Sequence, residues 1–203
     1  MSTKAAENSV PADFDLGAFW NQHKTKIIAL ALLVIVGLVL VATFKLVEHR
    51  KASSARDLLH SATTPTGYQS VIDKYPGTMA AANAHLLLAA EQRQEEKYEE
   101  AIETLESFME KYPDHPLIGG ARLSLGETQM AANQREKALQ TFQATAAQFR
   151  DSYSAPAAML EEASMYLTDG KPDEARRVLE DLISQFPESF MAQQAKIELR
   201  NLK

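Results

Sequence analysis

Cysteine is absent from this sequence of 203 residues, and glycine and proline are scarce at eight residues each. Without cysteine the chain has no disulfide framework, no thiolate zinc site, no cysteine nucleophile and no cysteine for lipid anchoring. The low glycine and proline content excludes a collagen-like or low-complexity chain. Ala, Glu, Leu, Gln and Lys dominate the second half instead, and this composition predicts helices.

Positive charge is also in deficit over most of the chain. Residues 52–203 hold 15 Lys and Arg against 23 Asp and Glu, a net charge of −8. A surface this acidic repels phosphate backbones, so we do not expect nucleic acid as a partner.

Residues with catalytic or metal-binding chemistry are few and scattered. The five histidines lie far apart, without metal-ligand or histidine–carboxylate spacing, and are interpreted as surface or turn residues. Eight glutamates between residues 91 and 110 recur at helical spacing and are interpreted as a solvated helix face. The sequence also lacks a glycine-rich phosphate loop and a nucleophile elbow. We therefore expect a non-enzymatic protein with no catalytic residue, no metal site and no cofactor.

One apolar run stands near the start of the chain. From Ile27 to Phe44 it holds 18 consecutive uncharged residues, which as a helix cover ~27 Å, close to the thickness of a bilayer core. Trp20 precedes it at a depth that suits the membrane interface. The alternative is a cleaved signal peptide, whose apolar region is usually about 7–15 residues long and ends at an A-x-A-like site. The sequence predicts a transmembrane helix over residues 27–46, after a short polar tail over residues 1–26.

A repeat of 37 residues organises the remainder of the chain. Several columns share this period: Tyr75, Tyr112, Phe149 and Phe186; Ala84, Ala121, Ala158 and Ala195; Leu86, Leu123, Leu160 and Ile197; and Ala101, Ala138 and Ala175. Coincident columns at one period indicate a solenoid of repeated helical units.

Each unit is predicted to hold two helices joined by a polar turn. The first helices are expected near residues 79–93, 116–131 and 154–168, and the second helices near residues 97–111, 134–149 and 172–186. Apolar residues within each helix fall at i, i+3/i+4 and i+7. Residues 47–60 and 68–75 match an earlier unit. Residues 190–202 match a first helix without a second, and Arg200 there replaces a small residue, which predicts a capping helix.

The columns resemble the signature of tetratricopeptide (TPR) repeats over residues 66–202. In that family a small residue of the first helix lies 12 positions before an Ala of the second, and a large apolar residue follows four later. This sequence has Ala89, Ala101 and Leu105; Gly126, Ala138 and Phe142; and Ala163, Ala175 and Leu179. The small residues allow the two helices to cross closely. The predicted fold class is all-α: a single N-terminal transmembrane helix, a helical stalk over residues 47–65, and a TPR-like solenoid over residues 66–203 with a C-terminal capping helix.

The TPR resemblance also implies a protein-binding groove, because the first helix of each unit lines the concave surface. The inward-facing positions hold Leu86, Ala90, Arg93 and Gln94; Leu123, Glu127, Met130 and Ala131; and Leu160, Ser164, Leu167 and Thr168. TPR domains that bind C-terminal carboxylates place Lys and Asn in this groove, whereas this chain has Leu where that Lys would lie. An apolar groove suits a hydrophobic segment, an amphipathic helix or a partly unfolded chain. The alternative is that the leucines pack between helices as core.

The order of segments resembles the YfgM-type family of bacterial inner-membrane proteins. The shared features are a short polar N-terminus, one span, a charged helical stalk, TPR-like units and an ending such as that of residues 197–202. The resemblance implies a cytoplasmic N-terminus and a periplasmic repeat domain that associates with the SecYEG translocon and with periplasmic chaperones such as PpiD. The flanking charges favour the opposite orientation, since Lys24 and Lys26 precede the span and four basic residues, from Lys45 to Arg56, follow it.

The predicted function is that of a membrane-anchored adaptor that binds other proteins, ancillary to the Sec translocon and to periplasmic chaperones that handle exported proteins. One alternative is a scaffold for envelope or cell-division assembly, and another is a TPR receptor that faces the cytoplasm. The predicted stalk either holds the domain at a fixed height or pairs with a second copy in a homo-oligomer.

Overall fold

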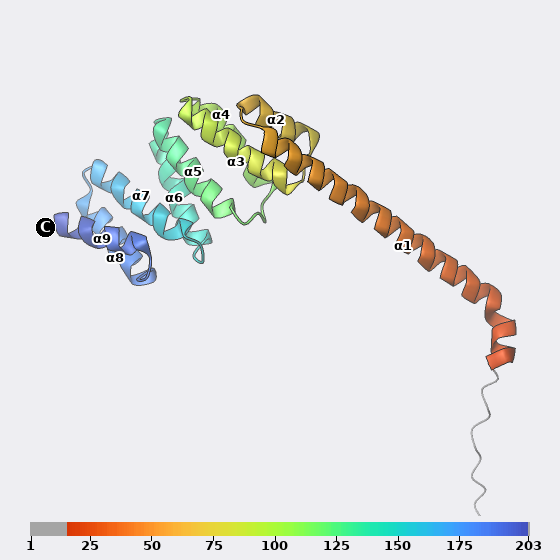
Figure 1. The fold of residues 1–203 in the computed structure, drawn as a ribbon. Helices are drawn as coiled ribbons and strands as arrows, with labels where there is room; N and C mark the ends of the chain where they lie inside the picture. Colours follow the sequence, from red (N-terminus) through yellow and green to blue (C-terminus); the bar gives the residue numbers. More distant parts are fainter. Residues whose placement is uncertain (1–15, 203) are drawn as a thin grey trace, which may run out of the picture. The chain divides into compact units, whose positions relative to one another are not determined.

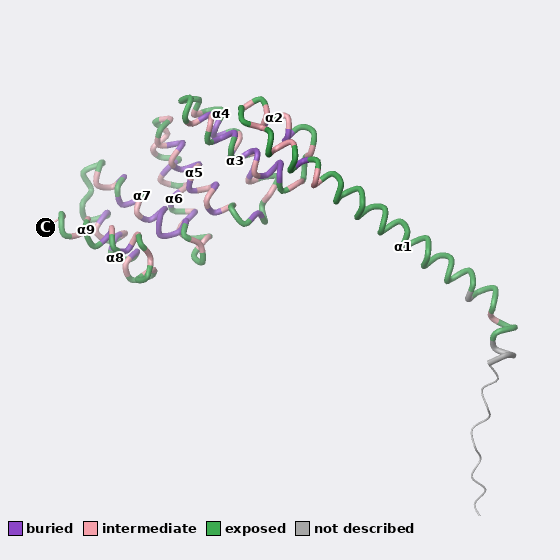
Figure 2. The backbone as a smooth tube through the Cα atoms, viewed as in Figure 1, coloured by how far each residue is buried: buried purple, intermediate pink, exposed green. Residues whose placement is uncertain are grey.

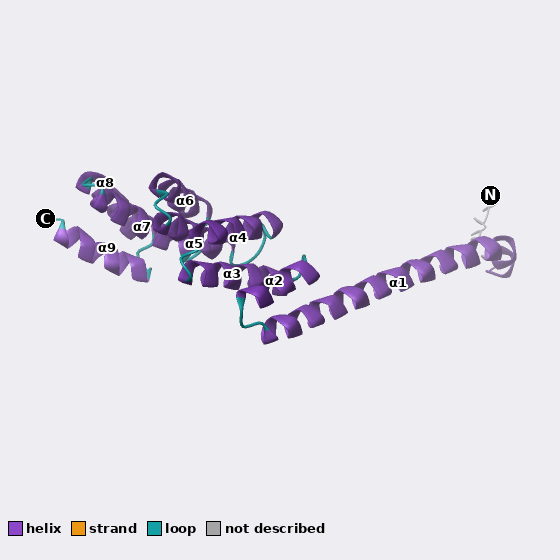
Figure 3. Cartoon of the chain, turned by 90° about the horizontal axis from the view of Figure 1, so that it is seen from above, coloured by secondary structure: helices purple, strands orange, loops and turns teal. Residues whose placement is uncertain are grey.

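A computed structural model describes residues 16–202, apart from the side chains of residues 16–19 and 27. Its regular secondary structure over this range is helical (Figures 1 and 3). The helices are α1 (Leu16–Ser61), α2 (Pro65–Lys74), α3 (Met79–Gln94), α4 (Tyr98–Lys111), α5 (Ile118–Ala131), α6 (Arg135–Gln148), α7 (Ser154–Thr168), α8 (Pro172–Gln185) and α9 (Phe190–Asn201). The chain divides at Arg50 into two compact units, so that α1 contributes to both.

The apolar segment of α1 exposes its side chains along its length (Figure 2). Leu30, Leu33 and Phe44 are 64%, 71% and 64% exposed. Within the described residues α1 is the one helix long and apolar enough to cross a membrane, judged by length and composition. The side chain of Ile27, where the predicted span begins, and residues 1–15 of the predicted tail lie outside the described residues.

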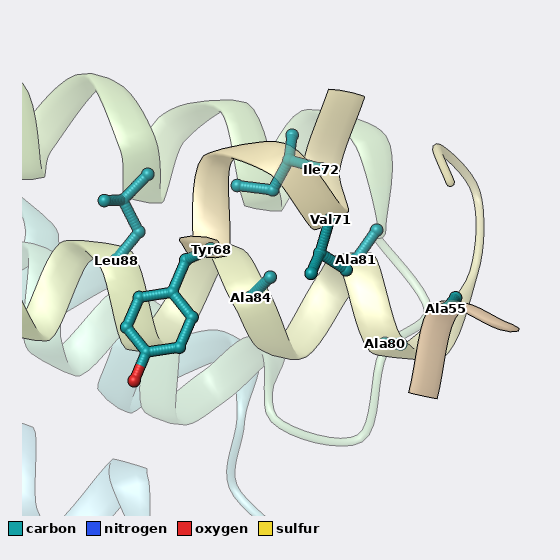
Figure 4. Close-up of a cluster of buried hydrophobic side chains, with 8 residues drawn as sticks. All are labelled: Ala55, Tyr68, Val71, Ile72, Ala80, Ala81, Ala84 and Leu88. Atoms are coloured by element: carbon teal, nitrogen blue, oxygen red, sulfur yellow. The ribbon is translucent and has the colours of Figure 1, made fainter. Parts of the chain in front are cut away.

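Helices α2 to α9 stack in chain order, each packed on the next, and α7 also contacts α5 and α9. The pairs α3/α4, α5/α6 and α7/α8 are the three predicted two-helix units, and α9 is a first helix that caps the last unit (Figure 1). The predicted all-α repeat fold is therefore confirmed. The end of α1 belongs to the same compact unit, since Ala55 is fully buried in a cluster with residues of α2 and α3 (Figure 4).

Helix bounds for α3 to α9 agree with the prediction within two residues, and the largest difference has a local cause. Helix α5 begins at Ile118 rather than at residue 116. The backbone N–H of Leu117 donates to Nδ1 of His115 at 3.1 Å, and the N–H of Ile118 donates to the carbonyl of His115 at 2.9 Å. These bonds hold the segment in a turn, which delays the helix.

The turn inside each unit has the same backbone in all three. Glu96, Asn133 and Gly170 stand 37 residues apart and have φ values of 58°, 60° and 69°. The next N–H returns to a carbonyl near the helix end, as from Lys97 to Gln92 at 2.8 Å, which is the bond of a Schellman motif. Glycine adopts this left-handed conformation freely, whereas a residue with a side chain does so at a cost of ~1–2 kcal/mol.

The small and large positions of the repeat signature lie in the core. Ala89 and Ala163 are each 1% exposed, and Leu105, Phe142 and Leu179 are 1%, 0% and 0% exposed. The helices of each unit cross at these positions, as the signature predicts.

Candidate functional site

The leucines of the predicted groove lie mostly in helix packing. Leu123 is 8% exposed and belongs to a buried cluster that includes Phe142. Leu86 and Leu160 are half-buried and pack against two other clusters. Their contribution to an accessible surface is therefore small, and it is smallest at Leu123.

The other positions of the predicted groove are more accessible. The exposed ones are Ala90, Gln94, Ala131, Ser164 and Thr168, and the half-buried ones are Arg93, Glu127, Met130 and Leu167. Six of them line two hollows, which we call the α3–α5 hollow (Ala90, Arg93, Gln94 and Ala131) and the α7–α9 hollow (Ser164 and Leu167), whereas Glu127, Met130 and Thr168 line neither.

The α3–α5 hollow has a volume of about 420 Å³ and is lined by Ala90, Arg93, Gln94, Tyr98 and Ala131. Four of these residues are predicted groove positions, and Tyr98, from the start of α4, is an addition that the sequence reasoning missed. The hollow combines small apolar side chains with an amide, a guanidinium and a phenol. This surface can bind a polypeptide by apolar contact and by hydrogen bonds to its backbone.

Arg93 spans the neighbouring first helices at the edge of this hollow. Its Nη1 donates to Oε2 of Glu127 at 3.1 Å and to Oγ of Ser124 at 2.8 Å. The side chains of the pair are 34% and 37% exposed, so solvent screens the attraction and its contribution to stability is below about 1 kcal/mol. Its main effect is to orient Arg93 and to neutralise the carboxylate of Glu127.

The α7–α9 hollow has a volume of about 230 Å³. It is lined by Leu160, Glu161, Ala163, Ser164, Leu167, Leu179, Gln194 and Glu198. Leu160, Ser164 and Leu167 are predicted groove positions from α7. The residues contributed by α8 and α9 were missed, because a repeat signature gives one helix face and not what the following helices bring against it.

Two glutamates near this hollow are destabilised in their charged forms. Burial, followed by the carboxylate of Glu127, raises the pKa of Glu161. Burial also raises the pKa of Glu162, although the side-chain amide of Gln143 donates to Oε1 of Glu162 at 2.8 Å and opposes the shift. Both carboxyl groups are therefore protonated more readily than a free glutamate, and Glu161 is the one that lines the hollow.

The histidine prediction is wrong for His85, which is 4% exposed and lies inside the domain rather than on its surface. Its ring lies edge-on to Tyr112, with ring centres 5.9 Å apart. Neither ring nitrogen meets hydrogen-bond geometry, although the backbone of Thr104 is near enough to affect its ionisation. Burial and then the ammonium of Lys111 lower the pKa of His85 to about 4, so the ring is neutral at pH 7. Sequence spacing missed this burial because His85 occupies a position with no fixed residue type in the repeat.

A second surface feature escaped the sequence reasoning. Large apolar side chains at the starts of the first helices are exposed: Met79 by 58%, Leu117 by 47%, Tyr153 by 64% and Phe190 by 80%. Three of them, Met79, Tyr153 and Phe190, fit the 37-residue period. Met79 and Phe190 are the first residues of α3 and α9, and Leu117 and Tyr153 directly precede α5 and α7.

The structure has paired helices, left-handed turns within the units and small residues where the helices pack. A comparison with family models agrees with this geometry. Residues 17–203 match the model of the tetratricopeptide repeat-like domain. The chain belongs to this family. TPR-like repeats are typical of adaptors that bind other proteins and of non-catalytic scaffolds. No curated protein matched the chain.

Solved structures show the same fold. One is a structure, with a single substitution, of the nearly identical TPR-like repeats of a protein assigned as a kinesin light chain of Podosopora anserina. Its sequence is 18% identical to this chain, and the match covers 76% of this chain and 84% of the solved chain, with a TM-score of 0.54. A second structure of these repeats is 16% identical, with the same coverage and a TM-score of 0.51. A tetratricopeptide repeat protein of Parabacteroides merdae is 14% identical, with 76% of this chain and 59% of its own covered and a TM-score of 0.56.

Proposed function

We propose that this chain is a membrane-anchored adaptor that binds polypeptide segments on its first-helix surface and assists exported proteins at the Sec translocon. The observation that carries the binding role is the pair of hollows on α3–α5 and α7–α9, which combine small or aliphatic side chains with polar groups. Such surfaces accept segments that are apolar without being uniform in sequence.

The anchor supports the membrane location of this role. Residues 27–46 cross the bilayer, and the exposed apolar side chains between Ile28 and Phe44 are then covered by lipid rather than by water. The resemblance to the YfgM-type family supports a bacterial inner membrane, a cytoplasmic N-terminus, a periplasmic repeat domain, and the SecYEG translocon and periplasmic chaperones as partners.

Topology is the first test. A reporter that is active only outside the cytoplasm, fused after Lys203, should be active in a bacterial host. A second fusion with a reporter active only in the cytoplasm serves as the control for expression. Activity of the cytoplasmic reporter alone would replace the proposal with a receptor that faces the cytoplasm.

Crosslinking tests the surface and the partner together. Because the chain has no cysteine, Ala90→Cys and Ala131→Cys each place a single thiol in the α3–α5 hollow, and Glu103→Cys places one on the exposed face of α4. A photocrosslinker on Ala90→Cys or Ala131→Cys should capture translocon subunits, chaperones or nascent exported chains, and on Glu103→Cys it should not. Capture of cell-division or peptidoglycan proteins instead would favour the envelope scaffold.

A further inference from the structure

The α7–α9 hollow differs from a plain apolar groove in its chemistry. Ala163 and Leu179 form a fully buried floor, and the half-buried Leu160 and Leu167 form its sides. The aliphatic side chains of Leu160 and Leu167 favour contact with a hydrocarbon chain of a few methylene groups.

Two carboxylates stand at the rim of this floor, on different helices. Glu161 projects from α7, and Glu198 projects from α9, where it accepts a hydrogen bond at 2.9 Å from Nε2 of Gln194. Over residues 16–202, no Lys, Arg or His forms an ion pair with either carboxylate. The hollow therefore has an apolar interior and an unneutralised negative rim.

The α3–α5 hollow differs from the α7–α9 hollow in the pairing of its nearest carboxylate. There the carboxylate of Glu127 is already neutralised by Arg93, at 3.1 Å. Glu161 and Glu198 have no such ion-pair partner among the described residues, so the α7–α9 hollow offers a cationic ligand two unpaired carboxylates. The pKa of Glu161 is raised by burial first and then by the carboxylate of Glu127, and a cation bound beside Glu161 would oppose this shift.

We infer that the α7–α9 hollow binds a lysine or arginine side chain of the partner polypeptide, with its aliphatic stem on Leu160 and Leu167 and its cation between Glu161 and Glu198. This inference rests on the proposed function and names the chemistry of the segment that is bound. Long basic side chains fit both requirements, because they combine an apolar stem with a charged end. A bound metal ion does not fit, since no group of three or more potential ligands occurs among the described residues.

Peptide binding to the full chain in detergent micelles tests the inference. The probe is a fluorescent nine-residue peptide with leucine at alternate positions and lysine at its centre. Peptides with arginine, norleucine or glutamate at the centre are compared with it by fluorescence anisotropy. Norleucine keeps the aliphatic stem and removes the charge. We expect lysine and arginine to bind about fivefold to tenfold more tightly than norleucine, glutamate to bind least, and the lysine advantage to shrink in 0.5 M salt.

Variants locate the effect. Glu161→Gln and Glu198→Gln should each lower the ratio of lysine to norleucine affinity, and the double variant should bring it near one, while norleucine binding stays unchanged. Glu180→Gln, an exposed carboxylate of α8 outside the hollow, is the matched control and should leave the ratio unaltered. Circular dichroism verifies that each variant is folded. A ratio that persists in both single variants and in the double variant overturns the inference.

The same titrations separate this inference from the proposed function. Equal binding of the lysine and norleucine peptides would overturn the cation preference and leave the peptide-binding role intact. Absence of binding by every peptide, together with no crosslinking from the α3–α5 hollow, would contradict both.

Discussion

The units α3/α4 and α5/α6 share one backbone plan but fill it with different side chains. At the helix crossing the first unit has Ala89 and Leu105, whereas the second unit has Gly126 and Phe142. A Cβ atom on Gly126 would lie 2.5 Å from Cε1 of Phe142, so the larger ring requires the smaller residue. The comparison shows that the repeat maintains the combined volume of the two side chains at the crossing rather than the identity of either residue.

The two units also differ in what they bury beside that crossing. The first buries His85, while the equivalent positions of the second and third units hold the half-buried Arg122 and the buried Met159. A neutral imidazole without hydrogen-bond geometry is costly to protonate. Acid sensitivity should therefore be concentrated in the first unit.

The largest expected effect is on pH dependence. The folded pKa of His85, about 4, lies below its ordinary value of 6.5, so the unfolded chain binds the proton that the folded chain excludes. Stability present above pH 6.5 is lost as the pH falls towards 4, by up to about 3 kcal/mol. Urea unfolding of the full chain in detergent, between pH 4 and 7.5, measures this loss. His85→Met, which copies the third unit, should remove it, and the exposed His60→Gln should not. The same acid loss in His85→Met would show that another group is responsible.

Exchanging volumes between the units should have the next largest effect. Gly126→Ala forces its Cβ against Phe142 and should cost ~1–3 kcal/mol of unfolding free energy. Adding Phe142→Leu, which copies the first unit, should recover much of this loss. Gly37→Ala, in the apolar part of α1 with nothing within 4 Å of its Cβ, is the control and should leave domain unfolding unchanged. Strict additivity in the double variant would argue against shared volume.

A smaller effect, with the opposite sign, is expected at the turns. Glu96→Gly gives the first unit the residue that the third unit has at Gly170 and removes the left-handed strain of a side chain, which should raise the unfolding free energy by about 1 kcal/mol. Thermal unfolding measures the gain. Asn133→Gly should gain less, because asparagine tolerates this conformation better. A loss of stability in Glu96→Gly would mean that the glutamate side chain contributes more than its strain costs.

The smallest effect concerns the exposed link between the first two units. A double-mutant cycle of Arg93→Met and Glu127→Gln should give a coupling of ~0.2–1 kcal/mol that disappears in 1 M salt. The arginine change copies Met130, which occupies the equivalent position of the second unit. Coupling that survives high salt would indicate that packing, rather than charge, joins the two residues.

Much of the fold could be predicted because its signals are local and are repeated. Small residues such as Ala89 and Ala101 mark each crossing, and the aromatic residues that follow mark each unit boundary, so one misread position does not shift the register. The delayed start of α5 was beyond this reasoning, since it depends on the hydrogen bonds that His115 forms in its turn. The left-handed conformation at Glu96 was equally hidden, because that residue type does not favour it.

The candidate site was less predictable than the fold. The signature identified the helix face that carries Ala90, Ser164 and Leu167, but it did not distinguish them from Leu123, whose side chain is 8% exposed. It also gave no sign that Glu198 would line the same hollow as Glu161, which lies 37 residues earlier.

The sequence by itself determined the helices, their 37-residue period, the crossing positions and a segment apolar enough to span a bilayer. These depend on neighbours along the chain and on periodicity, which are written directly in the order of residues. Only the tertiary structure decided that His85 is buried, that Arg93 neutralises Glu127, and that Glu161 and Glu198 share a hollow. Each of these depends on side chains from different helices meeting within a few ångströms, and at that range packing decides burial and charge environment.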